Sequence, residues 1–238
     1  MICGLQPVRE AIRAHGRRLT RVLVESDSGD GAQLDALARF ASDQGALVER
    51  LGRAALDRLA RGVRHQGAIA FAPQLSTVPV EALEVGDRSL FVALDEVQDP
   101  QNFGAAIRSA VAMGATAVVW PEHRSAPLSP ATFRASAGAV EHATLCRVRS
   151  LPTAITSLRA RGVVVVGLDM GGETPIDRFD LARPVAFVVG SEGKGLRKTV
   201  KRMCDARVRV PMAGSLASLN AAVAVAIALY EAVRQRGA

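Results

Sequence analysis

Short apolar runs alternate with amphipathic stretches over most of the chain. The apolar runs have the continuity of strands buried on both faces, and the stretches between them carry apolar residues at helical spacing. From residue 88 onward, the expected strands are 90–94, 117–120, 143–148, 163–168, 185–189 and 206–210, and the expected helices are 103–113, 129–137, 152–161 and 221–236. Strands that alternate with helices form mostly parallel sheets with right-handed crossovers, so this part predicts a doubly wound α/β domain.

The first 73 residues predict a smaller α/β unit. Helices are expected at 7–15, 32–44 and 53–61, and strands at 21–25, 46–49 and 68–72. Residues 74–87 carry Pro, Ser, Thr and Gly without a strong pattern, apart from one candidate helical turn at 80–83, and are typical of a linker. We therefore expect an N-terminal domain at 1–73, a linker at 74–87 and a second domain at 88–238.

A glycine-rich turn follows the expected strand 185–189. Its sequence at residues 190–196 is GSEGKGL. A strand, a glycine turn and a helix in succession can bring backbone N–H groups up to an anionic or polar ligand. The turn departs from a P-loop because Leu196 and Arg197 stand where Lys and Ser/Thr are needed, and its glycines do not follow the dinucleotide-binding spacing. A tight connection without a ligand is the alternative.

A second loop of this kind precedes the last expected helix. It runs from Pro211 to Asn220 and contains Gly214, Ser215 and Ser218. Two glycine- and serine-bearing loops that end parallel strands predict a ligand pocket at the carboxyl ends of those strands.

Charge suggests a class of partner. The chain has 30 Lys and Arg against 23 Asp and Glu, a net charge of +7. This balance is compatible with RNA or DNA, although an unspecialised basic surface would give the same total. The densest positive stretch, at 191–209, adjoins the glycine turn and is expected to face a nucleic-acid backbone. The candidate phosphate contacts are Arg17, Arg18, Arg64, His65, Lys194, Arg197, Lys198 and Lys201.

Other classes of protein are disfavoured. Cys3, Cys146 and Cys204 are scattered without CxxC spacing, which argues against a disulfide framework and a zinc site. His65 has no Cys or His at ligand spacing, so no metal is expected. No signal-peptide pattern and no apolar run of membrane length occurs, which predicts a soluble cytoplasmic protein.

Three segments together are specific. They are LDEVQDPQNFGAAIRSA at 94–110, VGSEGKGL at 189–196, and VPM at 210–212 continuing to SLN at 218–220. In this order they resemble the three motifs of the SpoU (TrmH) family of SPOUT methyltransferases, which transfer a methyl group from S-adenosylmethionine to a ribose 2′-hydroxyl of RNA. ICGLQPV at 2–8, HQG at 65–67 and EAVRQR at 231–236 are similar to the subgroup of 23S rRNA guanosine-2′-O-methyltransferases (RlmB-like).

The resemblance implies a fold and an assembly. It implies an α/β knot, that is, a deep trefoil knot in a mostly parallel sheet at the C-terminus, and a small N-terminal α/β RNA-binding domain similar to a ribosomal protein. It also implies a homodimer formed by the first catalytic-domain helix and the last helix. The Ala- and Val-rich stretch 221–230 is consistent with that dimer and equally with ordinary core packing.

The resemblance also implies where S-adenosylmethionine binds. Backbone groups in the loops of the knot hold the cofactor, so small and apolar residues should dominate the pocket. The residues carried over are Gly190, Val210 and Leu219, with Gly167, Leu168 and Met212 lining the same pocket.

The implied catalytic residues are Asn102, Arg108, Glu192, Ser218 and Asn220. Arg108 would activate the 2′-hydroxyl. Because a guanidinium keeps its charge, we favour phosphate binding and stabilisation of developing alkoxide charge over proton acceptance, which stays open. Asn102 would orient Arg108 or the ribose, and Glu192 would hold the turn or contact Asn102. Ser218 and Asn220 would line the substrate side. Alternatively, Asn102 is only a helix N-cap, Glu192 only a turn carboxylate and Ser218 only a cap.

The sequence therefore predicts an S-adenosylmethionine-dependent RNA ribose 2′-O-methyltransferase that acts on a guanosine of 23S rRNA. The alternatives are methylation of tRNA or of an rRNA site linked to antibiotic resistance, or a non-catalytic RNA-binding assembly factor. The presence of Arg108 and the glycines argues against the last alternative.

Overall fold

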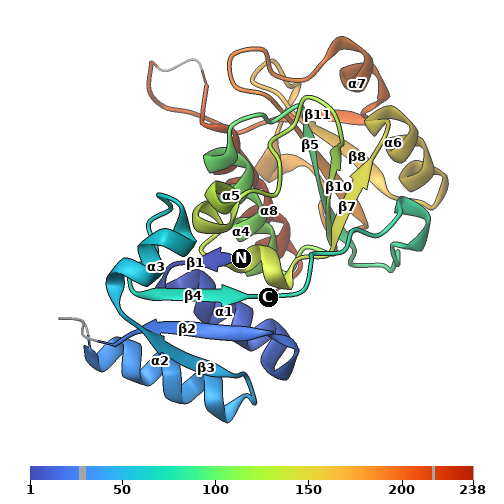
Figure 1. Cartoon of the computed structure of the whole chain (residues 1–238). Coiled ribbons are helices and arrows are strands. Elements are labelled where there is room, and N and C mark those ends of the chain that lie inside the picture. The colour runs from blue at the N-terminus through green and yellow to red at the C-terminus, as the bar shows by residue number, and fades with distance from the viewer. Residues whose placement is uncertain (27–30, 216–217, 238) are drawn as a thin grey trace. The chain divides into compact units, whose positions relative to one another are not determined.

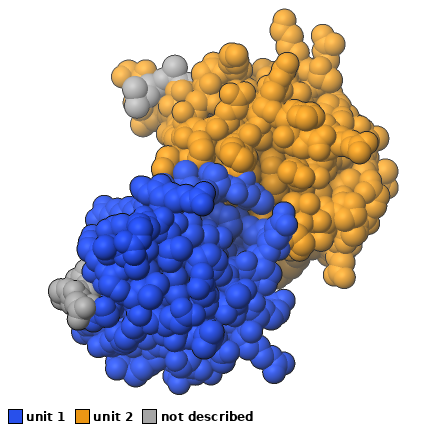
Figure 2. Space-filling view, viewed as in Figure 1, with its two compact units in different colours: residues 1–75, 128–142 blue, residues 76–127, 143–238 orange. Residues whose placement is uncertain are grey.

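The chain forms two compact units (Figures 1 and 2). The computed structural model describes residues 1–26, 31–215 and 218–237. Unit 1 comprises Met1–Leu75 with Leu128–His142, and unit 2 comprises Ser76–Pro127 with Ala143–Ala238. Helix α5 (Pro130–Ala135) and the 3₁₀ helix η3 (Ala139–His142) thus belong to unit 1, although they follow β6 (Ala117–Pro121) and precede β7 (Leu145–Val148) of unit 2.

Unit 1 contains a mixed sheet with the strand order β1-β4-β2-β3. The strands are β1 (Ile2–Cys3), β2 (Arg21–Glu25), β3 (Val48–Leu51) and β4 (Ala68–Phe71); β2 pairs in parallel with β3, whereas β4 is antiparallel to β1 and β2. The helices are α1 (Leu5–His15), α2 (Gly31–Asp43) and α3 (Arg53–Ala60).

Side-chain alternation along β2 accounts for the two cores of unit 1. Val22 and Val24 belong to the cluster formed with α1 and α2, and Leu23 between them packs with Leu56 of α3. Successive side chains of a strand point to opposite faces, so a continuous apolar run is what a strand covered on both sides requires.

Unit 2 is built on a larger sheet. In its described part the strand order is β7-β6-β5-β10-β8-β11-β9, and every described pair is parallel. The strands not yet given are β5 (Leu90–Asp95), β8 (Val164–Leu168), β9 (Thr174–Pro175), β10 (Val185–Gly190) and β11 (Ala206–Arg209). The predicted α/β class with a mostly parallel sheet is confirmed. The short strands β1 and β9 were not predicted, because two residues carry no periodicity.

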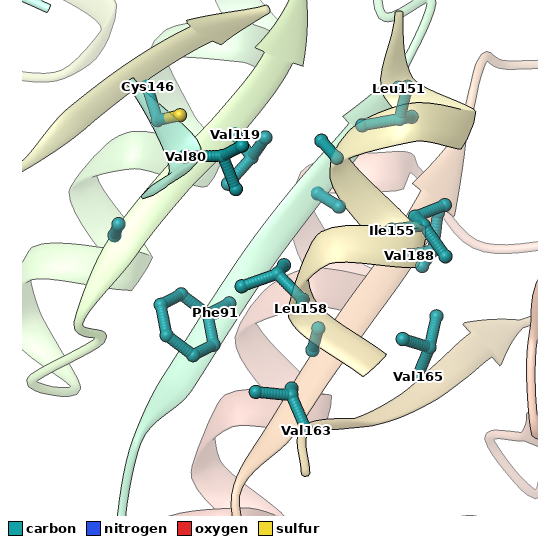
Figure 3. Close-up of a cluster of buried hydrophobic side chains, with 14 of the residues drawn as sticks. Val80, Phe91, Val119, Cys146, Leu151, Ile155, Leu158, Val163, Val165 and Val188 are labelled. Carbon is teal, nitrogen blue, oxygen red and sulfur yellow. The ribbon is translucent and has the colours of Figure 1, made fainter. Parts of the chain in front are cut away.

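Helices pack on this sheet through buried apolar side chains. α6 (Leu151–Ala160) places Leu151, Ile155 and Leu158 in one cluster with Phe91 and Val188 of the central strands (Figure 3). Val200 of α7 (Lys198–Met203) belongs to the same cluster. α4 (Pro100–Ala112) and α8 (Ala221–Gln235) pack against each other, and α8 also contacts β10.

The segment 74–87, predicted as a linker, contributes to the core of unit 2. It contains the 3₁₀ helix η2 (Val80–Ala82), and Val80 and Leu83 are buried in the cluster that α6 covers. The guanidinium of Arg161 donates hydrogen bonds to the carbonyl oxygens of Val80, at 3.0 Å, and Leu83. From about residue 78 the chain is therefore anchored to unit 2.

Candidate active site

A cavity of about 580 Å³ lies at the carboxyl ends of the strands of unit 2. Three loops line it, which follow β8, β10 and β11. Both loops that the sequence predicted as pocket walls contribute to it. The lining residues include Leu168, Asp169 and Met170, the turn from Gly190 to Leu196, and Val210, Ser218, Leu219 and Asn220.

The glycine turn after β10 folds back on itself. Ser191 and Gly195 form an isolated antiparallel bridge, and the Gly195 N–H donates to the Ser191 carbonyl oxygen at 2.8 Å. A Cβ atom at Gly190 would overlap the backbone of Gly195 and Leu196, and Gly193 has a φ of 76°. Glycine at position 190 is therefore a requirement of the turn itself.

An ion pair between a buried aspartate and a partly exposed arginine anchors the end of this turn. Asp95, at the end of β5, is 1% exposed and accepts hydrogen bonds from the backbone N–H of Arg197 at 2.9 Å and from its Nε at 2.6 Å. Arg197 also lies 3.1 Å from Glu96. Burial alone would lower the pKa of Arg197, but its hydrogen bonds and ion pairs with these carboxylates prevail and raise it. Arg197, predicted as an RNA contact, thus holds the turn to β5. No sequence motif links it to Asp95, which lies 102 residues earlier in the chain.

A polar cluster joins three of the predicted catalytic residues. The Asn220 side-chain nitrogen donates to Asn102 at 2.7 Å and to Glu192 at 2.6 Å. The Asn220 side-chain oxygen accepts from the backbone N–H groups of Ala222 and Val223 and so caps α8. These bonds fix the orientation of the amide, because its oxygen and nitrogen cannot be exchanged without losing them. Glu192 therefore reaches Asn102 through Asn220.

The alternative in which Asn102 is only the N-cap of its helix is wrong. α4 begins at Pro100, and the side chain of Asp99 accepts hydrogen bonds from Gln101 N at 3.1 Å and Asn102 N at 3.4 Å. Pro suits the first helical position, where no N–H is needed, so Asp99 and Pro100 together set the start. Ser218 is likewise not the cap of α8, since Asn220 has that position. The side chain of Asn102 is therefore free to bond Asn220.

Other predicted residues lie outside the cavity. Arg108 is exposed on α4 and makes no ion pair within the described chain. Gly167 and Met212 are not among the residues that line the cavity. A Cβ at Gly167 would lie 2.9 Å from Leu196 and 3.0 Å from Cys204, so this glycine permits close packing beneath the turn.

The basic residues predicted to contact RNA also fall into two groups, those that are exposed and those that form ion pairs within the chain. Lys194 lines the cavity, and Lys198 is exposed. Lys201 pairs with Asp169; burial raises the pKa of this aspartate less than the hydrogen bond from Lys201 and the other bonds and charges around it lower it, so the net pKa is below its ordinary value. Asp169 and Met170 line the cavity and were not predicted, because the loop after β8 carries no motif.

In unit 1, Arg17, Arg18 and Arg64 are exposed and His65 is buried. His65 Nδ1 accepts from Gly67 N at 3.0 Å, so its Nε2 carries the proton and donates to Asp57 at 2.9 Å. The imidazole thus holds the loop before β4. Within the described residues, no cluster of His, Cys, Asp and Glu could hold a metal ion, and no helix is long and apolar enough to cross a membrane.

Comparisons with known proteins agree with this division of the chain. Residues 89–230 match the family model "SpoU rRNA Methylase family", and residues 1–78 match "RNA 2'-O ribose methyltransferase substrate binding". The 23S rRNA (guanosine-2'-O-)-methyltransferase RlmB of Photobacterium profundum is 38% identical over 99% of this chain and 98% of its own length. An uncharacterised tRNA/rRNA methyltransferase of Mycolicibacterium vanbaalenii is 38% identical over 99% of this chain and 76% of its own length.

A solved structure supports the same assignment. The SpoU methyltransferase AviRb of Streptomyces viridochromogenes, in complex with the cofactor AdoMet, is 29% identical, has a TM-score of 0.78, and covers 99% of this chain and 89% of its own. The chain therefore belongs to the SpoU rRNA methylase family.

Proposed function

We propose that this chain transfers a methyl group from S-adenosylmethionine to the ribose 2′-hydroxyl of a guanosine in 23S rRNA, and that it works in the cytoplasm. The observation that carries the proposal is the end-to-end correspondence with RlmB, which includes both the cavity-bearing unit 2 and unit 1. Structures described as tRNA-modifying cover only 66% and 63% of this chain, whereas AviRb covers 99%. The additional N-terminal region therefore favours rRNA over tRNA.

The cavity suits S-adenosylmethionine. Its volume is in the range of small-molecule sites, and apolar Leu168, Val210 and Leu219 together with the glycine turn can receive an aromatic base and its ribose. When bound, S-adenosylmethionine supplies an activated methyl group on a positively charged sulfur. Exposed backbone groups of the turn, among them those of Gly193 and Lys194, are available to hydrogen-bond the cofactor.

The chain's own residues then have distinct tasks. Asn220 holds Glu192 and Asn102 in one hydrogen-bonded cluster beside the cavity, and we assign this cluster to the substrate side of the site. Correct alignment of the hydroxyl with the methyl donor accounts for much of the rate of such a displacement. We assign Arg108 to a phosphate of the substrate and to the negative charge that develops on the ribose oxygen, since a positively charged guanidinium suits both.

We also infer a homodimer through α4 and α8. Val223 and Tyr230 are 46% and 57% exposed on α8, and Arg108 is exposed on α4, which packs beside it. Val223 and Tyr230 are seven residues apart, so they lie on the same face of α8, and a second copy packed on that face would bury both. Arg108 does not line the cavity of its own chain. In such a dimer it would instead serve the cavity of the second copy.

We further infer that the C-terminal segment is knotted. β11 lies between β8 and β9, although β8 and β9 are joined directly by residues 169–173. The chain around this connection is tightly apposed to β11, because a Cβ at Gly172 would lie 2.6 Å from the carbonyl carbon of Val208. A later strand that occupies the space between two directly connected strands must pass across their connection, which supports a threaded topology.

The test is to map ribose 2′-O-methylation on rRNA from cells with and without the gene, and to repeat the transfer with purified protein. We expect a single 23S rRNA guanosine to lose its methyl group in the deletion strain and to regain it in vitro with S-adenosylmethionine. Methylation confined to tRNA, or no transfer to any RNA, would overturn the proposal.

A further inference from the structure

Unit 1 contains a second cavity, of about 400 Å³, that none of the tasks described above uses. It lies where the end of β2, the helix α3 and the loop before β4 meet. The residues that line it are Leu5, Glu25, Arg53, Asp57, Gly62, Val63, Arg64, His65 and Gln66.

A buried carboxylate lines this cavity. Glu25 is 5% exposed, and its one ion pair within the described residues is with Arg53, at 3.6 Å. No hydrogen bond from a described side chain reaches the Glu25 carboxylate. A buried carboxylate costs free energy unless hydrogen-bond donors satisfy it. Glu25 therefore presents acceptor positions to whatever enters the cavity.

The part of the lining next to Glu25 is held in an unusual conformation. Gln66 has a φ of 52° and the following Gly67 a φ of 76°. A left-handed backbone conformation costs little at glycine but is unfavourable at Gln66, and such a conformation persists where surrounding contacts stabilise it. His65 bonds to this turn, because its Nδ1 accepts from Gly67 N while its Nε2 donates to Asp57. The Gln66 side-chain oxygen lies 3.4 Å from Leu5 N, which leaves the Gln66 amide nitrogen available as a donor.

The rim carries the opposite charge. Arg53 has a side chain that is 69% exposed, and Arg64 is exposed beside it. Exposed arginines are suited to phosphate oxygens, whereas a buried carboxylate repels phosphate and accepts N–H donors. One ligand that matches both parts is a nucleobase inside the cavity with the phosphates of its strand along the rim.

We propose that this cavity, which we call the Glu25 pocket, binds an unstacked guanine base of the RNA substrate. Proteins read single-stranded RNA by hydrogen bonds to the edges of splayed-out bases. Guanine presents two adjacent N–H donors, at N1 and N2, and a carboxylate can accept both. Adenine, cytosine and uracil each place an acceptor next to their donor on that edge, which Glu25 would repel. The inference rests on the proposed function for the class of ligand, and it concerns a base bound by unit 1.

The first experiment changes only the RNA. Fluorescence anisotropy would measure binding of the full-length protein to a short single-stranded uridine oligonucleotide that carries one central guanosine, inosine or adenosine. A bidentate contact to a base edge discriminates by roughly ten-fold or more. We expect the guanosine oligonucleotide to bind about ten-fold more tightly than the adenosine one, with inosine between them because it keeps N1–H and lacks the N2 amino group. Equal affinities for the three would overturn the inference.

The second experiment changes the protein. Glu25→Gln keeps the size of the side chain and removes the paired acceptors, so we expect it to abolish the preference for guanosine. Glu49→Gln is the matched control, because it makes the same change of charge on the neighbouring strand β3, outside the pocket. A Glu25→Gln protein that still prefers guanosine would contradict the inference, as would a Glu49→Gln protein that loses the preference.

A third variant separates base from phosphate contacts. Arg53→Gln should weaken binding of all three oligonucleotides about equally and reduce the dependence on salt, since a phosphate contact carries no base information. Loss of the guanosine preference in this variant alone would contradict the assignment of Glu25.

Methyl transfer to 23S rRNA, measured in parallel, keeps the two proposals distinguishable. For Glu25→Gln we expect a raised KM for RNA, an unchanged kcat, and an unchanged dissociation constant for S-adenosylmethionine. Transfer by the wild type without any base preference would refute the pocket and leave the proposed function standing. A guanosine preference without transfer would do the reverse.

Discussion

At the scale of single residues, the candidate active site depends on three positions whose neighbours leave no room for a larger residue or bond the side chain in one orientation. Gly190 is enclosed by the backbone of the turn that it begins, and Asp95 is buried against Arg197. Asn220 bonds to both Asn102 and Glu192 while it caps a helix. A substitution at any of these positions should first change the positions of the neighbouring groups, and through them the alignment of the reactants.

Gly190→Ala should damage the cofactor site. The new Cβ would overlap backbone atoms, which cannot move away as a flexible side chain could, so the turn must open. We expect the dissociation constant for S-adenosylmethionine, measured by calorimetry, to rise at least about ten-fold. Gly86→Ala is the control, because a Cβ there has no neighbour within 4 Å, and it should bind normally. Unchanged cofactor binding in Gly190→Ala would show that the turn adapts.

Arg197→Gln should act on stability. It leaves the Asp95 carboxylate buried with fewer donors, which we expect to lower the free energy of unfolding by about 2 kcal/mol. Lys198→Gln, one position along and exposed, should change stability by less than about 0.5 kcal/mol. Urea denaturation of the two proteins would measure the difference, and equal midpoints would argue that the Asp95 pair contributes nothing.

Arg108→Ala should separate binding from catalysis. Since Arg108 does not line the cavity, the affinity for S-adenosylmethionine should be unaffected. Loss of a group that stabilises developing charge should lower kcat by about a hundred-fold. Arg149→Ala, another exposed arginine of unit 2, serves as the control in the same methyl-transfer assay. Normal transfer by Arg108→Ala would remove this residue from the mechanism.

At the scale of elements, the sequence predicted best those strands and helices whose local pattern alone defines them. The strand at 21–25 and the helix at 221–236 agree with β2 and α8 to within a residue, because the first is a short apolar run between polar residues and the second is alanine-rich without Gly or Pro. The partners of α5 could not be predicted. Its amphipathic pattern shows that one face is buried, but not that the face belongs to unit 1.

The same limit applies to the site. Both cavity loops were predicted from glycine spacing and from the resemblance, and the candidate catalytic residues on them from the resemblance. The ion pairs of Arg197 and Lys201 were not, since a run of basic residues looks equally suited to RNA and to carboxylates that lie far away in sequence, such as Asp95.

The packing of α5 and η3 within unit 1 leads to a prediction about Gly138, which lies between them. Gly138 has a φ of 86°, and a Cβ there would lie 2.9 Å from the Cα of Pro7 in α1. Gly162 has a φ of 83° and no neighbour within 4 Å. Gly162→Ala should therefore cost about 1 kcal/mol from backbone strain alone, and Gly138→Ala clearly more. Hydrogen exchange in η3 and α1 should increase only for Gly138→Ala; similar exchange in both variants would contradict this packing.

At the scale of the whole molecule, we expect the excess of positive charge to raise the affinity for RNA. The net charge is +7, and Lys194, Lys198 and the arginines at the rim of the Glu25 pocket are exposed to solvent. Each neutralised phosphate releases counterions, so the association constant for 23S rRNA should fall by at least about ten-fold between 50 and 200 mM salt. Filter binding over this range is the measurement. A constant affinity would show that the basic residues do not contact the backbone.

The position of β11 between β8 and β9 has a consequence for synthesis on the ribosome. Residues 164–175 emerge before 206–209, so the edge of β8 that β11 later fills stays unpaired while about thirty further residues are translated. A nascent chain halted in that interval has a sheet in which one edge of β8 lacks its hydrogen-bonding partner. Chaperone dependence should therefore be greatest for chains that end just short of β11.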